Sequence, residues 1–224
     1  MEHKFKWSGI KVVMGLGNPG AEYERTLHNA GAIVLRALAR FAGPLRLASS
    51  EARAKAPPIR ASLAKGGRRA GNARPSIFAA PPRKRFSFLQ RGTHIFALPS
   101  TFMNESGAAA AEALRYFRVK HEEFLLVHDD ADLPLGAFRL GFGRGSAGHH
   151  GAQSVIATLH TRNFWRLRVG IRPEMSHPRG REKAGLPAET RRVKAGDFVL
   201  RRMNTEEYEV LKETAEAIRR SLLK

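Results

Sequence analysis

The sequence predicts an α/β fold, in which strands and helices alternate along the chain. Two observations indicate this class. Short apolar runs typical of buried strands recur along the sequence, and the segments between them carry apolar residues at the 3.6-residue period of a helix. The chain has 224 residues, of which 42% are hydrophobic, and this is enough for one substantial core. We therefore expect one domain, residues 1–224.

The strand predictions rest on short apolar runs and, in the last run, on strict alternation. Trp165, Leu167, Val169 and Ile171 lie two residues apart, as do side chains on one face of a strand. The predicted strands are residues 11–14, 94–98, 124–128 and 165–171.

The helix predictions rest on apolar spacing and on signals for helix ends. Between residues 30 and 41, apolar residues recur at intervals of three and four, which places them on one face of a helix. Residues 105–117 are rich in alanine, and residues 155–159 carry a shorter apolar stripe. Asn204 and Glu207 have the spacing of a capping box, which predicts the start of a last amphipathic helix.

Two basic segments interrupt the alternation. Residues 48–86 are rich in Gly, Pro and Ala, and the stretch from Ala52 through Asn104 contains no acidic residue. Because like charges at this density resist compaction, we interpret residues 48–86 as a mobile basic insertion on the surface. Residues 173–194 are interpreted as a second basic loop.

The chain as a whole is strongly basic, with 39 Lys and Arg against 20 Asp and Glu and a formal charge of +19. Such a field attracts polyanions and indicates nucleic acid binding, although a ribosome-associated or solubilising surface would have the same composition. Cysteine is absent, and no stretch is long and apolar enough to span a bilayer. We expect a cytoplasmic protein or, in a eukaryote, one of an organellar matrix.

The segment Gly15-Leu16-Gly17-Asn18-Pro19-Gly20 matches the G-x-G-x-x-G pattern of dinucleotide-binding sites. Such a site also needs a helix that starts at the motif and an acidic residue about 20 positions later. No acid occurs between Glu24 and Glu51, Pro19 removes an N–H donor, and helical periodicity begins only near Ala30. We therefore expect no dinucleotide here, and no cofactor.

Polar side chains occur instead near the ends of the predicted strands, where open α/β sheets bind ligands. They are Asn18, Tyr23, His28 and Asn29 after the first strand, Asn104 after the second, and Asp129, Asp130 and Asp132 after the third. Each has a structural alternative, because Asn-Pro-Gly is common in turns and Asn and Asp often cap helices.

The chemistry of this set suits hydrolysis by a water molecule that a histidine activates, since no nucleophilic cysteine and no G-x-S-x-G elbow is present. A carboxylate would orient the imidazole, and amide N–H groups would stabilise the oxyanion. A metal site is the alternative, with His128, His149, His150 and the Asp cluster as possible ligands. Adjacent histidines in a loop rarely converge on one ion, and no H-E-x-x-H motif is present, so we expect no metal.

Five blocks of sequence occur in order: GLGNPGAEYERTLHNAG, LPSTFMNESG, HDDADLPLGAFRL, GSAGHHG and FWRLRVGI. Together they resemble the bacterial-type peptidyl-tRNA hydrolases over most of the chain outside the two basic segments. The resemblance implies one α/β domain with a twisted, mixed, mostly parallel sheet flanked by helices on both faces. It also implies a monomeric enzyme, independent of metals, that hydrolyses the ester bond between peptide and tRNA and so recycles tRNA from aborted translation.

Site residues follow from the same resemblance. By motif, His28 corresponds to the catalytic base, Asp129 to its partner, and Asn18 and Asn104 to the amides that hold the peptidyl group and water. The implied substrate-binding residues are Tyr23, Met103 and His150 in the pocket, and Arg139 and Arg168 against phosphates of the tRNA acceptor stem and 3′ CCA end.

One position departs from the family pattern. Where the family has Gly-Gly-His-Asn-Gly, this sequence has Gly148-His149-His150-Gly151. Neutral imidazole can donate one hydrogen bond, but it is larger than the Asn carboxamide and lacks its paired donor and acceptor. The departure at His150 concerns substrate placement, while the base and its carboxylate are retained.

Two other functions stay open from the sequence. One is a non-catalytic RNA-binding relative, similar to plastid splicing factors or associated with ribosomes; the retained His28, Asp129, Asn18 and Asn104 argue against it. The other is a nucleotide-dependent oxidoreductase, which the missing ribose-binding acid disfavours.

Overall fold

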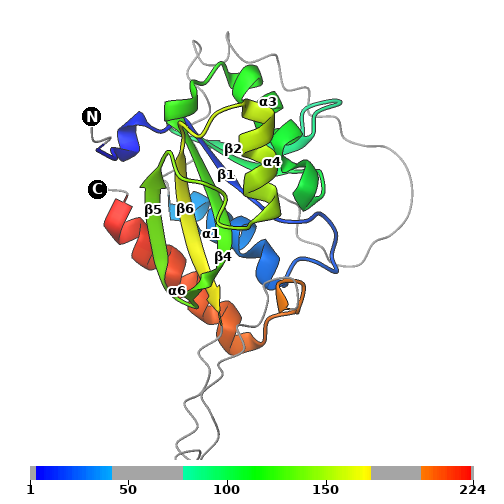
Figure 1. Ribbon diagram of the computed structural model, residues 1–224, viewed down its shortest axis with the longest axis vertical. Coiled ribbons are helices and arrows are strands. Elements are labelled where there is room, and N and C mark those ends of the chain that lie inside the picture. The colour runs from blue at the N-terminus through cyan, green and yellow to red at the C-terminus, as the bar shows by residue number, and fades with distance from the viewer. Residues whose placement is uncertain (1–3, 42–77, 173–197, 223–224) are drawn as a thin grey trace, which may run out of the picture.

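The computed structural model describes residues 4–41, 78–172 and 198–222. Within them lies a six-stranded sheet of order β2-β3-β1-β4-β6-β5 (Figure 1). The strands are β1 (Val12–Gly15), β2 (Phe86–Arg91), β3 (His94–Pro99), β4 (Phe124–Pro134), β5 (Phe138–Phe142) and β6 (Trp165–Arg172). The central pairs are parallel and the two edge strands, β2 and β5, pair antiparallel with their neighbours. The mixed, mostly parallel sheet is thus confirmed.

The two edge strands were not predicted from the sequence, whereas the four inner ones were. β2 begins inside the segment interpreted as a basic insertion. β5 has the sequence Phe-Arg-Leu-Gly-Phe, in which Arg139 and Gly141 break the apolar run. Both strands form because a neighbouring strand pairs with them, and this long-range contribution is not visible in local composition.

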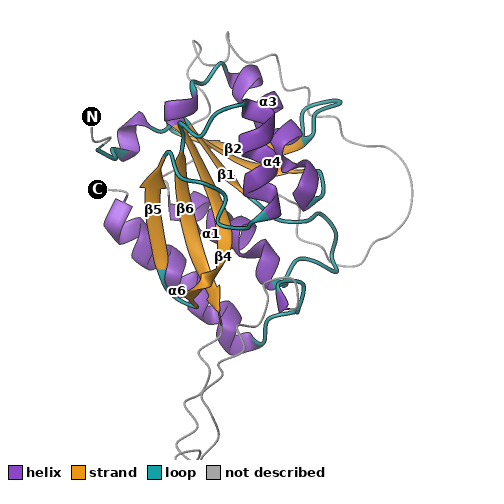
Figure 2. Ribbon diagram, in the orientation of Figure 1, coloured by secondary structure: helices purple, strands orange, loops and turns teal. Residues whose placement is uncertain are grey.

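Helices cover both faces of the sheet (Figure 2). The α-helices in the described residues are α1 (Ala30–Phe41), α3 (Ser106–Phe117), α4 (His150–Leu159) and α6 (Thr205–Leu222), and the short 3-10 helices are η1 (Trp7–Gly9), η2 (Leu27–Asn29), η3 (Met103–Glu105) and η4 (His121–Glu123). α1 and α6 pack on one face and share a core through Leu35, Leu38 and Leu211, while α3 and α4 pack on the other through Leu114 and Val155. The predicted flanking of the sheet by helices is confirmed.

The start of α6 has the predicted capping box. The Asn204 Oδ1 accepts the Glu207 N–H at 2.8 Å, and the Glu207 Oε2 accepts the Asn204 N–H at 2.9 Å. None of the helices described here is both long and apolar enough to cross a membrane.

β4 extends beyond its predicted end at residue 128 and continues to Pro134. β1 ends earlier, at Gly15, whose partner on β4 is Val127, so the following residues of β4 pair with β6 alone. Asp129 and Asp130 therefore lie within a strand and not after its end, which corrects the prediction. They stand where β1 has left the sheet, and this leaves room for another segment to reach them.

α1 approaches β4 closely because residue 31 is a glycine. A Cβ on Gly31 would lie 2.5 Å from the Val127 carbonyl oxygen and 3.0 Å from the His128 Cα. Packed atoms do not tolerate such distances, so a larger residue would push the start of α1 away from the strand. Gly31 thus allows the residues just before α1 to reach the exposed length of β4.

The two segments interpreted as basic loops lie largely outside the described residues. Residues 173–194 lie wholly outside them. Of residues 48–86, the structure describes only 78–86, where Phe78 is buried and Ala79 forms a bridge with Phe88.

Candidate active site

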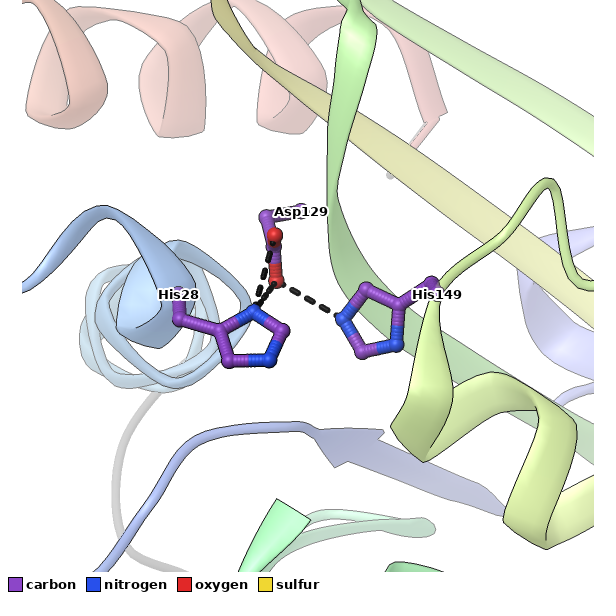
Figure 3. Close-up of side chains that lie close together, drawn as sticks. All are labelled: His28, Asp129 and His149. Atoms are coloured by element: carbon purple, nitrogen blue, oxygen red, sulfur yellow. Dashed lines mark hydrogen bonds and ion pairs between the residues drawn. The ribbon is translucent and has the colours of Figure 1, made fainter. Parts of the chain in front are cut away.

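His28 lies in η2, directly before α1, and is buried. Its backbone N–H donates to the Val199 carbonyl oxygen at 2.8 Å, so a segment distant in sequence fixes its position. The ring Nδ1 lies 3.0 Å from both carboxylate oxygens of Asp129 on β4 (Figure 3). The structure therefore brings the predicted base and its predicted partner together.

A second imidazole, that of His149, reaches the same carboxylate from the opposite side (Figure 3). Its Nε2 lies 2.8 Å from Asp129 Oδ1, and its Nδ1 accepts the Ala152 N–H at 3.1 Å as the N-cap of α4. Because Nδ1 accepts, the ring proton is on Nε2 and points to Asp129. Sequence reasoning considered His149 only as a possible metal ligand. Its helix-capping position carries no local signal for a contact with Asp129.

Asp129 is held as a carboxylate by these two rings. Burial on its own would raise its pKa, but the electrostatic attraction of the neighbouring His149 ring and the hydrogen bonds from His149 and His28 outweigh burial and hold the pKa well below its usual range. A fixed negative charge next to His28 keeps the Nδ1 proton in place. The Nε2 lone pair of His28 is then left as the basic atom of the ring.

His28 lines an open pocket of about 410 Å³. The other lining residues are Asn18, Phe102, Met103, Asn104, His150, Val199 and Leu200. Phe102 is 53% and Leu200 55% exposed, although both side chains are large and apolar. The pocket thus combines an apolar rim with a base and two carboxamides, which suits a substrate that has both an apolar part and a polar reacting group.

The carboxamide of Asn18 is oriented by the backbone around it. Its Oδ1 accepts the Met103 N–H at 2.8 Å, which leaves Nδ2 as the donor of a side chain that lines the pocket. Asn29 has a structural role, because its side chain accepts the Asn18 N–H at 2.8 Å and donates to the Asn18 carbonyl oxygen at 3.0 Å. These bonds hold the loop after β1 in place. The first α-helix after the glycine motif begins at Ala30, as predicted, and the Ala32 N–H in its first turn donates to the Leu16 carbonyl oxygen of the motif at 2.9 Å.

The remaining pocket residues are placed as follows. Asn104 is in the middle of η3, and neither η3 nor the following α3 has a side-chain N-cap bond, so its alternative explanation as a cap does not hold. Met103 is buried and lines the pocket, and His150 lines it from the exposed start of α4. Tyr23 is not among the lining residues, but its ring meets the ring of Phe102 edge-on at 6.3 Å.

Arg139 and Arg168 lie outside the pocket, opposite each other on β5 and β6. Arg139 is exposed, whereas the Arg168 guanidinium is paired with the buried carboxylate of Asp130. Neighbouring Arg166 is buried, and its burial and the charges of Arg168 and other arginines lower its pKa to about 10. This edge of the sheet therefore has a strong positive potential with one carboxylate inside it.

A metal ion does not fit the polar atoms that converge on Asp129. Among the described residues, His28, Asp129 and His149 are the group whose ligand atoms lie within 4.8 Å of one another. These atoms are already joined by direct hydrogen bonds, and the second nitrogen of His149 is used in the helix cap. His128, another ligand considered above, uses its Nδ1 to bond the Asp129 carbonyl oxygen at 2.8 Å. The three side chains thus form one hydrogen-bonded cluster.

Comparison with known proteins decides the family. Residues 12–224 match the sequence profile of the peptidyl-tRNA hydrolases. The chain belongs to the peptidyl-tRNA hydrolase family. It is 37% identical over 202 residues to the peptidyl-tRNA hydrolase of Cupriavidus necator, covering 90% of this chain and 84% of the relative. It is 35% identical over 219 residues to that of Marinobacter nauticus, covering 95% and 87%.

Solved structures of the family share the fold. The crystal structure of peptidyl-tRNA hydrolase from Acinetobacter baumannii superposes with a TM-score of 0.60 at 24% identity, covering 96% of this chain and 86% of that one. An Arg119Gln mutant of the same protein gives a TM-score of 0.61. The family membership and the shared fold provide a reaction, the hydrolysis of peptidyl-tRNA, by which the polar pocket around His28 can be interpreted.

Proposed function

We propose that this protein hydrolyses the ester bond of peptidyl-tRNA by means of a water molecule that His28 activates. Its membership of the peptidyl-tRNA hydrolase family establishes the activity, which releases tRNA. The observation that carries the mechanism is the bond of His28 Nδ1 to Asp129, which leaves Nε2 free to take a proton beside the pocket.

In the first step, the water oxygen forms a bond to the ester carbonyl carbon as one water proton moves to His28 Nε2. The imidazolium is stabilised by the Asp129 carboxylate, which His149 holds from its other side. The Nδ2 amide of Asn18 donates to the oxyanion or to the attacking water, and the Asn104 carboxamide, which lines the same pocket, assists it. In the second step, the bond to the ribose oxygen breaks, and that oxygen takes the proton from Nε2.

The substrate parts divide between the pocket and the sheet edge. The apolar rim, with Met103 and with Tyr23 behind Phe102, receives the residue attached to the ester, and His150 contacts the peptidyl group where the family has Asn. Arg139 and Arg168 bind phosphates of the acceptor stem near the 3′ CCA end, because guanidinium groups match phosphate geometry. We propose that the protein acts as a monomer in the cytoplasm; the relatives named above are bacterial.

The test is the hydrolysis of N-acetylated aminoacyl-tRNA by the wild type and by His28→Gln. Loss of a general base reduces a rate by about 10² to 10⁴-fold, so we expect kcat to fall by that factor. The affinity for uncharged tRNA, measured by filter binding, should change by less than about twofold, because the imidazole makes no phosphate contact. The control is His121→Gln in η4, at the other end of β4.

The outcomes separate the alternatives. A His28→Gln enzyme with undiminished kcat would contradict the mechanism. A wild-type protein that binds tRNA but does not hydrolyse the ester would indicate the non-catalytic RNA-binding relative.

A further inference from the structure

A buried carboxylate, that of Asp130, lies within the group of arginines at the β5–β6 edge. The Asp130 side chain is 2% exposed, whereas that of Arg168, its partner in an ion pair, is 25% exposed. Arg139 lies beside Arg168 on β5, and Arg166 lies two residues before it on the same face of β6. A polyanion at this edge can therefore reach Arg168 but not Asp130. Because a carboxylate weakens the attraction of the edge for phosphate, electrostatic attraction alone does not explain its presence.

The Asp130 side chain is fixed by the backbone of its own strand. The register of β4 against β6 shifts between Asp130 and Pro134, an irregularity of the kind that redirects side chains. At this point the Asp130 Oδ1 accepts the Asp132 N–H at 2.8 Å. Gly170 lies opposite Asp130 on β6, and a Cβ there would lie 1.9 Å from the Pro134 carbonyl oxygen. The turn in β4 thus depends on a glycine in β6, and it uses one oxygen of the carboxylate.

The other oxygen of Asp130 holds the Arg168 guanidinium by one particular nitrogen. Arg168 Nε donates to Asp130 Oδ2. In the part of the chain that the structure describes, this is the hydrogen bond that the guanidinium makes, and it does not use the edge formed by Nη1 and Nη2. That edge carries parallel N–H donors, with which arginine binds phosphate through two hydrogen bonds. A guanidinium held at Nε therefore keeps both terminal nitrogens for a ligand.

Asp130 also lies close to a second guanidinium, that of Arg166. Arg166 is buried, and its Nη1 has no hydrogen-bond partner among the described residues. Burial is the main cause that lowers the pKa of Arg166, the charge of Arg168 lowers it further, and the charge of Asp130 raises it. Without the carboxylate, the two guanidinium groups would repel each other, and the more exposed Arg168 would turn toward solvent. Asp130 thus holds Arg168 at the sheet by its charge as well as by its hydrogen bond.

We propose that Asp130 is a positioning residue for tRNA binding, which presents the Nη1–Nη2 edge of Arg168 to a phosphate of the acceptor stem. This inference rests on the proposed function, in which Arg168 binds such a phosphate. It reverses the effect expected of an acid near a polyanion. Removal of a negative charge should strengthen the binding of tRNA if charge alone matters, but removal of the Asp130 charge should weaken it.

The variant Asp130→Asn tests this role because a carboxamide cannot serve both partners of the carboxylate. The Asp132 N–H and the Arg168 Nε–H are both donors, and the carboxamide has one acceptor oxygen. Its NH2 group would face one of these donors, so the variant keeps the size of the side chain but no longer holds Arg168. We expect the affinity for uncharged tRNA to fall about tenfold. The slope of log affinity against log salt concentration should decrease by roughly 0.7 to 0.9.

The variant Arg168→Lys gives a second test, in which the net charge does not change. Lysine carries its charge on one nitrogen, so the atom that pairs with Asp130 is also the atom that would bind phosphate. We expect this variant to bind tRNA about as weakly as Asp130→Asn. In the double variant the ammonium group is released from the carboxylate, so the affinity should rise several-fold above that of either single variant. The change at Asp130 thus acts in opposite directions in the arginine and lysine backgrounds, which a purely structural role would not produce.

The control is Glu122→Gln, which removes one negative charge from an exposed residue of η4, at the other end of β4. It should bind tRNA as tightly as the wild type or slightly more tightly. Thermal melts establish that each variant is folded at the assay temperature. If Asp130→Asn does not fold, Arg168→Lys decides by itself, because wild-type affinity and salt slope in that variant would overturn the proposal.

The remaining outcomes are equally decisive. An Asp130→Asn protein that binds tRNA as tightly as the wild type would overturn the proposal, and so would losses that add up in the double variant. Hydrolysis of N-acetylated aminoacyl-tRNA by the same proteins should show the loss mainly in KM, because neither residue lines the active-site pocket. A wild type that binds tRNA without cleaving the ester would refute the proposed reaction, whereas the pattern of tRNA affinities alone decides the role of Asp130.

Discussion

At the residue scale, Asp129 determines the charge balance of the site because two imidazoles donate to it. His28 and His149 each contact the carboxylate through one ring nitrogen, but they differ in the use of the other nitrogen. In His149 the other nitrogen accepts a hydrogen bond in the cap of α4. His28 lines the pocket, and its contacts with Asp129 use Nδ1 and not Nε2. One ring is therefore available for proton transfer, and the other fixes the carboxylate that supports it.

His128, next to Asp129 in sequence, should make folding stability depend on pH. Burial, followed by the electrostatic effect of the neighbouring His149 ring, holds the pKa of His128 well below its usual range, so this ring stays neutral in the folded state. In the unfolded chain it binds a proton below about pH 6.5. Because the unfolded state then binds more protons, the free energy of unfolding falls as pH falls from about 6.5 to 5. Asp129, whose pKa is depressed, affects stability only at lower pH, from the ordinary carboxyl range downward.

The measurement is urea unfolding at several pH values between 5 and 7.5 for the wild type, His128→Gln and His160→Asn. One protonating group contributes a slope of at most about 1.4 kcal/mol per pH unit, and His128→Gln should lose most of this contribution. His160→Asn replaces an exposed residue in a left-handed conformation that Asn tolerates, so its slope should match the wild type within error. Equal slopes in all three proteins would show that His128 does not remain neutral on folding.

The sequence predicts the residues of the site better than their contacts. The pairing of His28 with Asp129, which are 101 residues apart, could be expected because the family motifs name both. The bond from His149 to Asp129 could not, since it depends on where the loop before α4 is placed in space. The roles of Asn18, Asn104, Tyr23, Met103, His150, Arg139 and Arg168 remain predictions. Arg168 differs from the simple expectation because Asp130 already partners it.

At the element scale, the segment before α6 connects the last helix to His28, the proposed catalytic base. Leu27 N–H donates to the Arg201 carbonyl oxygen at 3.1 Å, and His28 N–H donates to Val199. Arg201 in turn binds both carboxylate oxygens of Glu207, at 3.0 and 2.5 Å. The capping box of α6 thus anchors a segment that both positions His28 and lines the pocket through Val199 and Leu200. The capping box was predictable from Asn204 and Glu207, but its connection to His28 is a tertiary effect.

Glu207→Gln should therefore weaken catalysis as well as stability. Gln can still serve in a capping box, so the variant removes mainly the charge that the Arg201 guanidinium binds. We expect a loss of about 1 kcal/mol, which corresponds to a decrease of about 2 to 4 °C in Tm for a chain of this size. We also expect kcat to fall several-fold, because the segment that holds His28 loses its anchor.

The matched control for this prediction is Glu209→Gln on the same helix. Glu209 forms an exposed pair with Lys212, and exposed pairs contribute little. Assays of kcat and thermal melts on both variants decide the matter. If Glu207→Gln lost stability but kept the wild-type kcat well below its Tm, the connection to His28 would be structural only.

At the scale of the whole molecule, arginine side chains gather at one edge of the sheet. Different helices cover the two faces of that sheet. α3 and α4 cover one face over the β1–β3 side, and the β5–β6 edge of that face bears Arg139, Arg166 and Arg168, with Arg144 and Arg162 close enough to influence Arg166. α6 covers the opposite face (Figure 2). The formal charge of +19 predicts attraction to a polyanion but not which surface meets it. Strand order supports the β5–β6 edge as that surface, because it places the arginines beside the end of β4 that carries Asp129.

Arg139→Ala should weaken tRNA binding and reduce its dependence on salt. Arg139 is the better choice than Arg168 for this test, because it is exposed, whereas removal of Arg168 would leave the Asp130 carboxylate buried without its partner. Each phosphate contact contributes roughly 0.7 to 0.9 to the slope of log affinity against log salt concentration, so the slope should decrease by about that amount.

The matched control is Arg220→Ala, an exposed arginine on α6 at the opposite face. With affinities measured between 50 and 200 mM salt, the control should follow the wild-type line. Since Arg139 lies outside the pocket, kcat at saturating substrate should not change. A decrease of the same size in both variants would mean that net charge alone attracts the tRNA, and that the β5–β6 edge has no special place in binding it.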